Sequence, residues 1–223
     1  MSTYDQLAAV YEALTPPALH TPEGSVAAFD GLLDLPPGAR VLDCACGTGT
    51  LAVGLALRGF NVDASDLSPA MIERTRRLAA ERGVVVDARV CAWEDLEPGP
   101  RYVAVFCVGN SIPHARDRVA ALRAMAATLT GTLYVTSRNW ERERLGGSRT
   151  EVNGPVTHVW TIPDGWEEPH FLDITVHAVH ERLTVWPFTH EQLEADLRAV
   201  GLKIAQNTYA PNVQRYLIAA RVP

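Results

Sequence analysis

Short apolar segments rich in β-branched residues alternate with amphipathic segments along residues 39–137. Buried parallel strands have this composition, and two parallel strands need a crossover connection between them, which is usually a helix. The alternation therefore predicts an α/β fold with a doubly wound, mostly parallel sheet. The predicted strands cover residues 39–44, 60–65, 84–90, 102–108 and 132–137, and the predicted helices cover 50–57, 68–82 and part of 116–128.

Segments at the two ends of the chain extend this sheet and cover it. Residues 4–14 have apolar side chains at helical spacing, and Thr21 followed by Pro22 starts a helix predicted to reach about Leu33. Residues 189–192, Thr-His-Glu-Gln, form a capping box that starts another helix. Two strands that we expect to pair antiparallel follow this helix and bring the predicted sheet to seven strands.

A chain of 223 residues fits a single domain around one sheet. We therefore predict one domain that has N-terminal helices and a β-rich insert after the fifth strand. Its expected parts are an N-terminal helical lid over residues 1–37, a cofactor-binding core over 38–139, a substrate-side insert over 140–188, and a C-terminal helix and strands over 189–223.

The insert interrupts the rhythm of strands and helices and holds four of the seven histidines. Residues 171–186 alternate like one strand, and residues 157–162 could pair with it. Uninterrupted alternation would place His180 and Arg182 on the mostly apolar, inward face of that strand. Buried polar groups must be paired, so these two side chains would contact either a substrate or an internal salt-bridge partner.

The turn after the first predicted strand, in VLDCACGTGT at residues 41–50, is rich in small residues and typical of a nucleotide-binding site. It also fits the dinucleotide pattern G-x-G-x-x-G/A, with Asp66 following at about 20 residues. A carboxylate at Asp43 would repel a pyrophosphate, however, and would attract a positively charged ligand such as S-adenosylmethionine. Asp43 therefore disfavours the alternative of a nicotinamide-dependent oxidoreductase, as does the lack of a Tyr-x-x-x-Lys motif, since Lys203 is the only lysine.

These residues resemble the first motif of the class I, Rossmann-like, S-adenosylmethionine-dependent methyltransferases. Ala45 stands where that family has a glycine, and alanine would fit there if its φ were negative. The segment VDASDLSPAMI resembles the second motif, which implies that Asp66 holds both ribose hydroxyls. CAWEDL resembles the segment beside the adenine, and the segments CVGNSIPH and SRNW resemble the glycine N-methyltransferase type.

This resemblance implies an enzyme that binds S-adenosyl-L-methionine and methylates a small molecule, with nitrogen favoured over oxygen as the acceptor atom. A non-catalytic S-adenosylmethionine-binding regulatory protein is the alternative from a different class. The cofactor-binding residues that we predict are Asp43, Ala45, Gly47, Gly49, Asp66, Leu67, Met71, Ala92, Trp93 and Val108.

The residues expected near the acceptor follow the fourth and fifth strands or lie in flanking segments. Asn139, His114 and His180 are the catalytic candidates: the asparagine would orient an amine, and either histidine could be the general base for a hydroxyl. The predicted substrate-binding residues are Asn110, Arg138, Asn139, Arg182 and Tyr11.

Structural roles remain open for several of these residues. Asn110 could be a turn residue, His114 a helix cap and Arg138 an ion-pair partner. Tyr11, with Tyr4 on the same side of the first helix, could close over the cofactor or pack against it.

Composition narrows the partners. The net charge of −6 and the lack of a basic stripe disfavour nucleic acid. No apolar run is long enough for a membrane span or a signal peptide, so we expect a cytoplasmic protein, with a homodimer left open. The four cysteines lack metal-ligand spacing and are expected to be small packing residues, and we predict no metal site.

Overall fold

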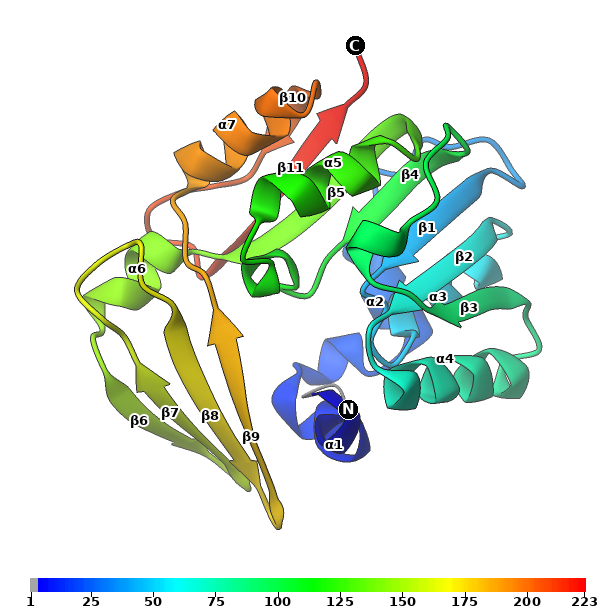
Figure 1. The fold of residues 1–223 in the computed structure, drawn as a ribbon. Coiled ribbons are helices and arrows are strands. Elements are labelled where there is room, and N and C mark those ends of the chain that lie inside the picture. The colour runs from blue at the N-terminus through cyan, green and yellow to red at the C-terminus, as the bar shows by residue number, and fades with distance from the viewer. Residues whose placement is uncertain (1–3) are drawn as a thin grey trace.

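The computed structural model describes residues 4–223 and contains a seven-stranded sheet, which confirms the predicted α/β fold (Figure 1). Strands β1 to β5 are parallel, and β11 is antiparallel to both of its neighbours. The strands in spatial order are β10 (Lys203–Asn207), β11 (Arg215–Arg221), β5 (Leu129–Arg138), β4 (Tyr102–Cys107), β1 (Arg40–Cys44), β2 (Asn61–Asp66) and β3 (Val86–Val90).

Helices cover both faces of this sheet because alternate strand residues point to opposite sides. Val41 of β1 belongs to one apolar cluster, together with side chains of α2 (Pro22–Ala27), α3 (Thr50–Leu57) and α4 (Pro69–Glu81). Leu42, the next residue, belongs to a second cluster with α5 (Arg118–Ala126) and α7 (His190–Ala199).

The chain order reverses direction at β1, and this reversal positions the site. From β1 the chain proceeds to β2 and β3 on one side, and then crosses to β4 and β5 on the other. In open α/β sheets a crevice forms outside the carboxyl ends of the strands at this switch point, and ligands bind there. Asp43 lies at this point, paired in register with Ala64 of β2 and Phe106 of β4.

The insert begins with α6 (Trp140–Leu145) and forms a second, antiparallel sheet. The inner face of this sheet shares the apolar cluster of α5 and α7. Figure 1 shows it extending away from the carboxyl edge of the main sheet. Its strands are β6 (Arg149–Asn153), β7 (Val156–Thr161), β8 (His170–Val176) and β9 (Val179–Val185), and β7 pairs with β8 as predicted.

The prediction of one continuous strand over residues 171–186 is wrong, because a two-residue turn at His177 and Ala178 divides it into the β8–β9 hairpin. The turn reverses the parity of the alternation, so His180 and Arg182 lie on the outer face opposite the core. Their side chains are 65% and 63% exposed. Arg182 forms a two-pronged ion pair with Asp173, at 2.7 and 2.9 Å.

The N-terminal segment lies between the insert and α4 (Figure 1). It starts with α1 (Tyr4–Leu7) and continues as a 3₁₀ helix over Ala8–Leu14 rather than as the single α-helix predicted. Helix α2 ends at Ala27, short of the expected Leu33. Within residues 4–223, no helix is sufficiently long and apolar to traverse a bilayer.

Side chains of α4 fix this segment in place. Ser68 caps α4 by accepting a hydrogen bond from the Met71 amide at 3.2 Å. The same hydroxyl donates to Asp5 at 2.5 Å. Arg74 binds the Ala8 carbonyl and the Glu12 carboxylate. The N-terminal segment is therefore held over the carboxyl ends of β1 and β2, where it can cover a ligand.

Candidate functional site

The turn between β1 and α3 contains three residues with positive φ. These are Ala45 at 114°, Gly47 at 54° and Gly49 at 82°. The expectation that Ala45 has a negative φ is wrong. A Cβ clashes with the neighbouring backbone in this region, so alanine is strained where glycine would not be. At Gly49 a Cβ would lie 2.6 Å from Cγ2 of Thr75, so both conformation and close contact require glycine there.

Asp43 is the last residue but one of β1, beneath this turn, and its side chain is buried. The residue is 1% exposed, and within residues 4–223 neither carboxylate oxygen accepts a hydrogen bond. Burial, reinforced by the charge of Asp66, raises the pKa of Asp43 to about 7, and the backbone amide of Ala52 opposes that rise only in part. A buried carboxylate without a donor is costly unless a ligand supplies one. The ammonium group of S-adenosylmethionine has the charge and the donors that Asp43 lacks.

Asp66 ends β2 and ties the glycine turn to the neighbouring strand. Its Oδ2 accepts from the Gly47 amide and its Oδ1 from the Ser68 amide, both at 2.9 Å. Burial raises the pKa of Asp66 above its ordinary value, and the two backbone hydrogen bonds oppose that effect. Both amides stabilise the ionised carboxylate, which can therefore still accept hydrogen bonds from hydroxyl groups of a ligand.

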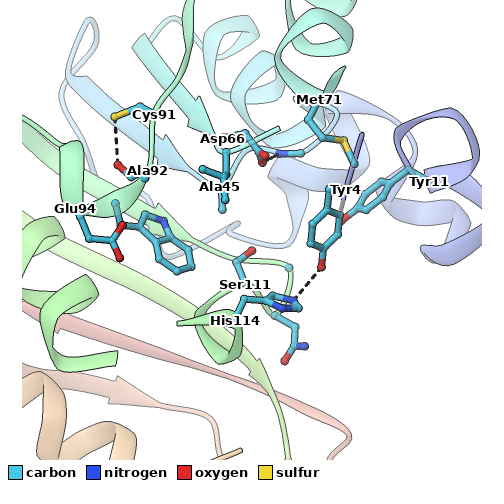
Figure 2. Close-up of a pocket in the computed structure, with 15 residues that line it drawn as sticks. Tyr4, Tyr11, Ala45, Asp66, Met71, Cys91, Ala92, Glu94, Ser111 and His114 are labelled. Atoms are coloured by element: carbon cyan, nitrogen blue, oxygen red, sulfur yellow. Dashed lines mark hydrogen bonds between the residues drawn. The ribbon is translucent and has the colours of Figure 1, made fainter. Parts of the chain in front are cut away.

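A first cavity of about 240 Å³ opens above Asp66 (Figure 2). In Figure 2, Asp66 and Ala45 lie between Tyr4 and Tyr11 on one side and the segment of Ala92 and Glu94 on the other. Most of the predicted cofactor-binding residues line it. The residues that it brings together from the prediction are Ala45, Gly47, Asp66, Leu67, Met71, Ala92 and Trp93, with Tyr11, Asn110 and His114 from the acceptor side.

The wall formed by residues 91–94 suits a flat apolar ring. The Trp93 indole Nε1 donates to the Cys44 carbonyl at 3.0 Å, which fixes the ring beside β1. Met71 lines the same cavity, and polarizable sulfur next to an aromatic ligand is favourable. The contact expected from Ala92 and Trp93 toward an adenine is therefore compatible with this geometry.

His114 lies in this cavity and connects three parts of the chain. Its Nδ1 is 3.1 Å from the Thr184 carbonyl of β9, and its Nε2 is 2.9 Å from the Tyr4 hydroxyl (Figure 2). A carbonyl can only accept, so Nδ1 carries the proton, and the lone pair on Nε2 accepts from Tyr4. Burial lowers the pKa of His114, which keeps the ring neutral. The structure therefore presents His114 as a neutral base with a fixed tautomer.

A second cavity, of about 500 Å³, shares Tyr11, Ala45 and Gly47 with the first. Asp43 and Val108 line it, as do Thr136 of β5 and Arg215 at the start of β11. The two cavities therefore meet over the glycine turn. Together they offer room for a cofactor and an acceptor on the two sides of that turn.

Asn110 and Arg138 make contacts that also give them structural roles. Asn110 has a positive φ of 69° and lines the first cavity. Its Oδ1 accepts from the Arg138 amide at 2.9 Å, which ties the end of β4 to the end of β5. The Arg138 guanidinium pairs with Glu143 at 3.3 Å and lines neither of the two cavities.

Asn139 is 1% exposed and lies outside both cavities. Its Oδ1 caps α6 by accepting from the Arg142 amide at 3.1 Å. Its Nδ2 lies 3.3 Å from the Ala210 carbonyl and 3.2 Å from that of Val213. The predicted contact between Asn139 and an acceptor is therefore replaced by a structural role, since both ends of the amide are already engaged.

His180, Arg182 and Gly49 also lie outside the two cavities. The first two are on the outer face of the insert, and Gly49 contributes by letting the turn pack against Thr75. Among residues 4–223, no group of three or more His, Cys, Asp or Glu side chains could hold a metal ion.

Sequence reasoning did not select some of the residues that line the cavities. Cys91, Glu94 and Ser111 line the first cavity, and Arg215 lines the second. Ser111 and Glu94 are near predicted residues in the chain, so proximity to the strand ends was the signal that could have found them. Arg215 follows a loop late in the chain, and only its register opposite Arg138 brings it to the site.

Comparison with known proteins finds methyltransferases that are similar in sequence to the part of the chain that contains the glycine turn. The methyltransferase-domain family matches residues 41–131. The ubiquinone biosynthesis O-methyltransferase of Xanthomonas campestris pv. campestris (strain B100) is 41% identical over 108 residues. That match covers 46% of this chain and 44% of the relative, so the two proteins correspond over less than half of their lengths.

Solved methyltransferase structures match nearly the whole chain. The CcbJ methyltransferase of Streptomyces caelestis has a TM-score of 0.82 at 20% identity, over 100% of this chain and 98% of its own. An amino pentose methyltransferase from Micromonospora echinaspora, solved with S-adenosylmethionine bound, has a TM-score of 0.63 at 20% identity, over 100% and 98%.

The comparisons agree with the fold seen in the structure. The chain has the Rossmann-like fold of S-adenosylmethionine-dependent methyltransferases, and residues 41–131 match the methyltransferase-domain family. The buried Asp43 carboxylate suits a positively charged ligand such as S-adenosylmethionine.

Proposed function

We propose that this chain transfers a methyl group from S-adenosylmethionine to a hydroxyl group of a small molecule, with His114 as the general base. The observation that carries this proposal is the fixed tautomer of His114, whose Nε2 lone pair lies in the cavity beside the glycine turn. The two adjoining cavities are of a size that suits a small acceptor rather than a macromolecule.

The residues proposed to bind the cofactor lie at, or just after, the carboxyl ends of β1, β2 and β3. Asp43 would bind its ammonium group, Asp66 its ribose hydroxyls, and the segment of Ala92 and Trp93 its adenine. When bound, the cofactor supplies a methyl group on a positively charged sulfur. Tyr4 and Tyr11 would exclude water from above, since both line the cavity and belong to the N-terminal segment that α4 holds in place.

His114 would remove the proton that a hydroxyl acceptor must lose. In the structure the Tyr4 hydroxyl donates to Nε2, and an acceptor hydroxyl that displaces it from Nε2 would make the same hydrogen bond. The lowered pKa keeps His114 deprotonated, and the Thr184 carbonyl holds the ring and stabilises the charge that develops when Nε2 takes the proton. A correctly placed general base typically increases the rate of such a reaction by about 10²–10⁴-fold.

Oxygen replaces nitrogen as the preferred acceptor atom in this proposal. The preference for an amine rested on Asn139, Asn110 and the resemblance to the glycine N-methyltransferase type. The Asn139 amide is engaged in capping α6 and in binding the loop before β11, and the Asn110 carbonyl oxygen accepts from the Arg138 amide. The Xanthomonas relative is an O-methyltransferase by name. The structural match to an amino pentose methyltransferase concerns the fold. Membership of the glycine N-methyltransferase type stays a prediction.

A methyl-release assay with S-adenosylmethionine and a panel of phenols, sugar hydroxyls and amines tests the proposal. We expect turnover with hydroxyl compounds, and we expect His114→Asn to reduce it by about 10²-fold or more. His180→Asn is the matched control, because that histidine is exposed on the insert. Turnover of amines alone, unaffected by His114→Asn, would refute the role of the base. Tight binding of S-adenosylhomocysteine with no turnover across the panel would instead favour a regulatory protein, and preferential binding of NAD an oxidoreductase.

A further inference from the structure

Arg215 is the one arginine among residues 4–223 that lines either of the two cavities over the glycine turn. It is the first residue of β11 and pairs in register with Arg138, the last residue of β5. This register places it at the carboxyl end of β5, on the edge of the main sheet that borders the second cavity. Its side chain remains accessible from the cavity.

The guanidinium of Arg215 has no anionic partner within the described chain. Within residues 4–223, no carboxylate lies within ion-pair distance of the Arg215 guanidinium, and this side chain forms no hydrogen bond. The nearest candidate, Glu143, is already paired with Arg138 at 3.3 Å and with Arg149 at 2.7 Å. This group of three arginines therefore has an excess of positive charge, and the unpaired charge belongs to Arg215.

The other acids around the second cavity do not neutralise Arg215 either. Glu12 lines that cavity but forms an ion pair with Arg74. Asp43 is buried beneath the glycine turn, where it faces the position proposed for the ammonium group of the cofactor. Among the described residues that line the second cavity, the Asp43 carboxylate below the turn and the Arg215 guanidinium at the edge of the sheet therefore form no ion pair.

We propose that Arg215 determines substrate specificity by binding a carboxylate of the acceptor. An arginine presents parallel N–H donors that match the two oxygens of a carboxylate, and this geometry selects planar acids over neutral groups. More of the lining surface is apolar than polar, with Phe29 and Leu217 among the apolar side chains and threonines such as Thr136 among the polar ones. The acceptor class is therefore a hydroxy acid with an apolar body, and this inference rests on the proposed function.

The experiment compares matched pairs of acceptors, each a hydroxylated aromatic carboxylic acid and its neutral carboxamide. Wild type, Arg215→Gln and Arg215→Lys are assayed for methyl release, and the affinity for S-adenosylhomocysteine is measured by calorimetry. We expect wild type to prefer the acid, and Arg215→Gln to lower kcat/KM for the acid by about ten- to a hundredfold while leaving the amide unaffected. Lysine should restore part of the preference, because it keeps the charge but not the two-pronged geometry.

The cofactor also has a carboxylate, and the calorimetry separates the two possibilities. A loss of S-adenosylhomocysteine affinity of tenfold or more in Arg215→Gln would overturn the proposal, since the arginine would then bind the cofactor. Equal use of acids and amides by wild type would overturn it as well. Failure of the proposed function has a different signature: wild type would then bind no S-adenosylhomocysteine, or would release methyl to no hydroxyl compound at all.

Discussion

The hydroxyl of Tyr4 lies 2.9 Å from Nε2 of His114, although 110 residues separate them in the chain. The two rings also meet edge to face, with centroids 5.6 Å apart. Because Thr184 of β9 holds the other nitrogen of the ring, His114 joins the N-terminal helix, the segment after β4 and the insert. The N-terminal segment and the proposed base are therefore coupled by one hydrogen bond.

Removing that hydrogen bond with Tyr4→Phe should raise the pKa of His114 toward its ordinary value of 6.5. The Tyr4 hydroxyl donates to the lone pair of the neutral ring, so its loss removes a contact that favours the neutral form. The pKa of His114 should therefore rise in Tyr4→Phe. An NMR titration of the His114 ring protons measures it. Tyr11→Phe is the control, and a lower or unchanged pKa in Tyr4→Phe would contradict the assigned tautomer.

Removing the buried charge of Asp43 should stabilise the ligand-free protein but weaken the binding of S-adenosylhomocysteine. A pKa raised from 3.8 to about 7 means that the folded protein binds this proton more tightly than the unfolded chain does. The contribution of Asp43 to the free energy of unfolding is therefore most favourable below pH 3.8 and is lost as the pH rises toward 7. At pH 8, Asp43→Asn should stabilise the ligand-free protein, by an amount on the order of a few kcal/mol. It should also weaken S-adenosylhomocysteine binding at least about tenfold.

Thermal unfolding from pH 5 to 8 and calorimetric titration measure these two effects. Asp63→Asn is the matched control, because Asp63 is a buried acid that does have partners: Arg40 at 2.7 Å and Tyr102 at 2.6 Å. That variant should destabilise the protein and leave ligand binding unchanged. A destabilised Asp43→Asn variant at pH 8 would show that the carboxylate has a favourable partner in the ligand-free protein.

The sheet and the glycine turn could be predicted because local sequence determines both. Each of the first five strands contains apolar, β-branched residues, and Asp43 and Asp66 lie at the carboxyl ends of β1 and β2. Parallel strands align their carboxyl ends, so residues at those ends converge whatever the details of the helices. The cavity beside Asp66 is a direct consequence.

The outer position of His180 and Arg182 could not be predicted from alternation alone. The segment 171–186 has no glycine, proline or asparagine at its centre to mark a turn. The turn falls at His177 and Ala178, where His177 adopts a φ of 52°, an uncommon conformation for a residue other than glycine. The turn at these two residues therefore places every later side chain of the segment on the face opposite to the predicted one.

Long-range register accounts for the other differences. Asn139 follows β5 as predicted, but the loop before β11 supplies the carbonyls that bind its amide, and no local pattern indicates that contact. Arg215 reaches the second cavity because β11 pairs with β5 antiparallel, in a register that places it opposite Arg138. Contacts between segments 70 or more residues apart depend on the whole fold.

Replacing Ala45 with glycine should stabilise the protein, because the backbone conformation at this position favours glycine. A φ of 114° strains a residue with a Cβ, and such strain costs on the order of 1–3 kcal/mol. Ala45→Gly should therefore raise the midpoint of thermal unfolding by about 2–4 °C, after the entropy cost of glycine is subtracted. Ala56→Gly, within helix α3, is the control and should lower the midpoint. A lower midpoint in both variants would mean that the turn tolerates alanine without strain.

Gly49 combines a positive φ with a close contact, and a matched glycine separates these two effects. Gly49 and Gly59 have φ values of 82° and 85°, but a Cβ at Gly59 would meet no atom within 4 Å, whereas one at Gly49 would lie 2.6 Å from Thr75. Gly59→Ala should therefore cost about 1 kcal/mol of unfolding free energy from backbone conformation alone. Gly49→Ala should cost at least about 2 kcal/mol more, because Thr75 is buried and cannot move without disturbing α4. Urea unfolding of both variants measures the difference, and equal losses would show that the conformation, rather than the contact with Thr75, requires glycine in this turn.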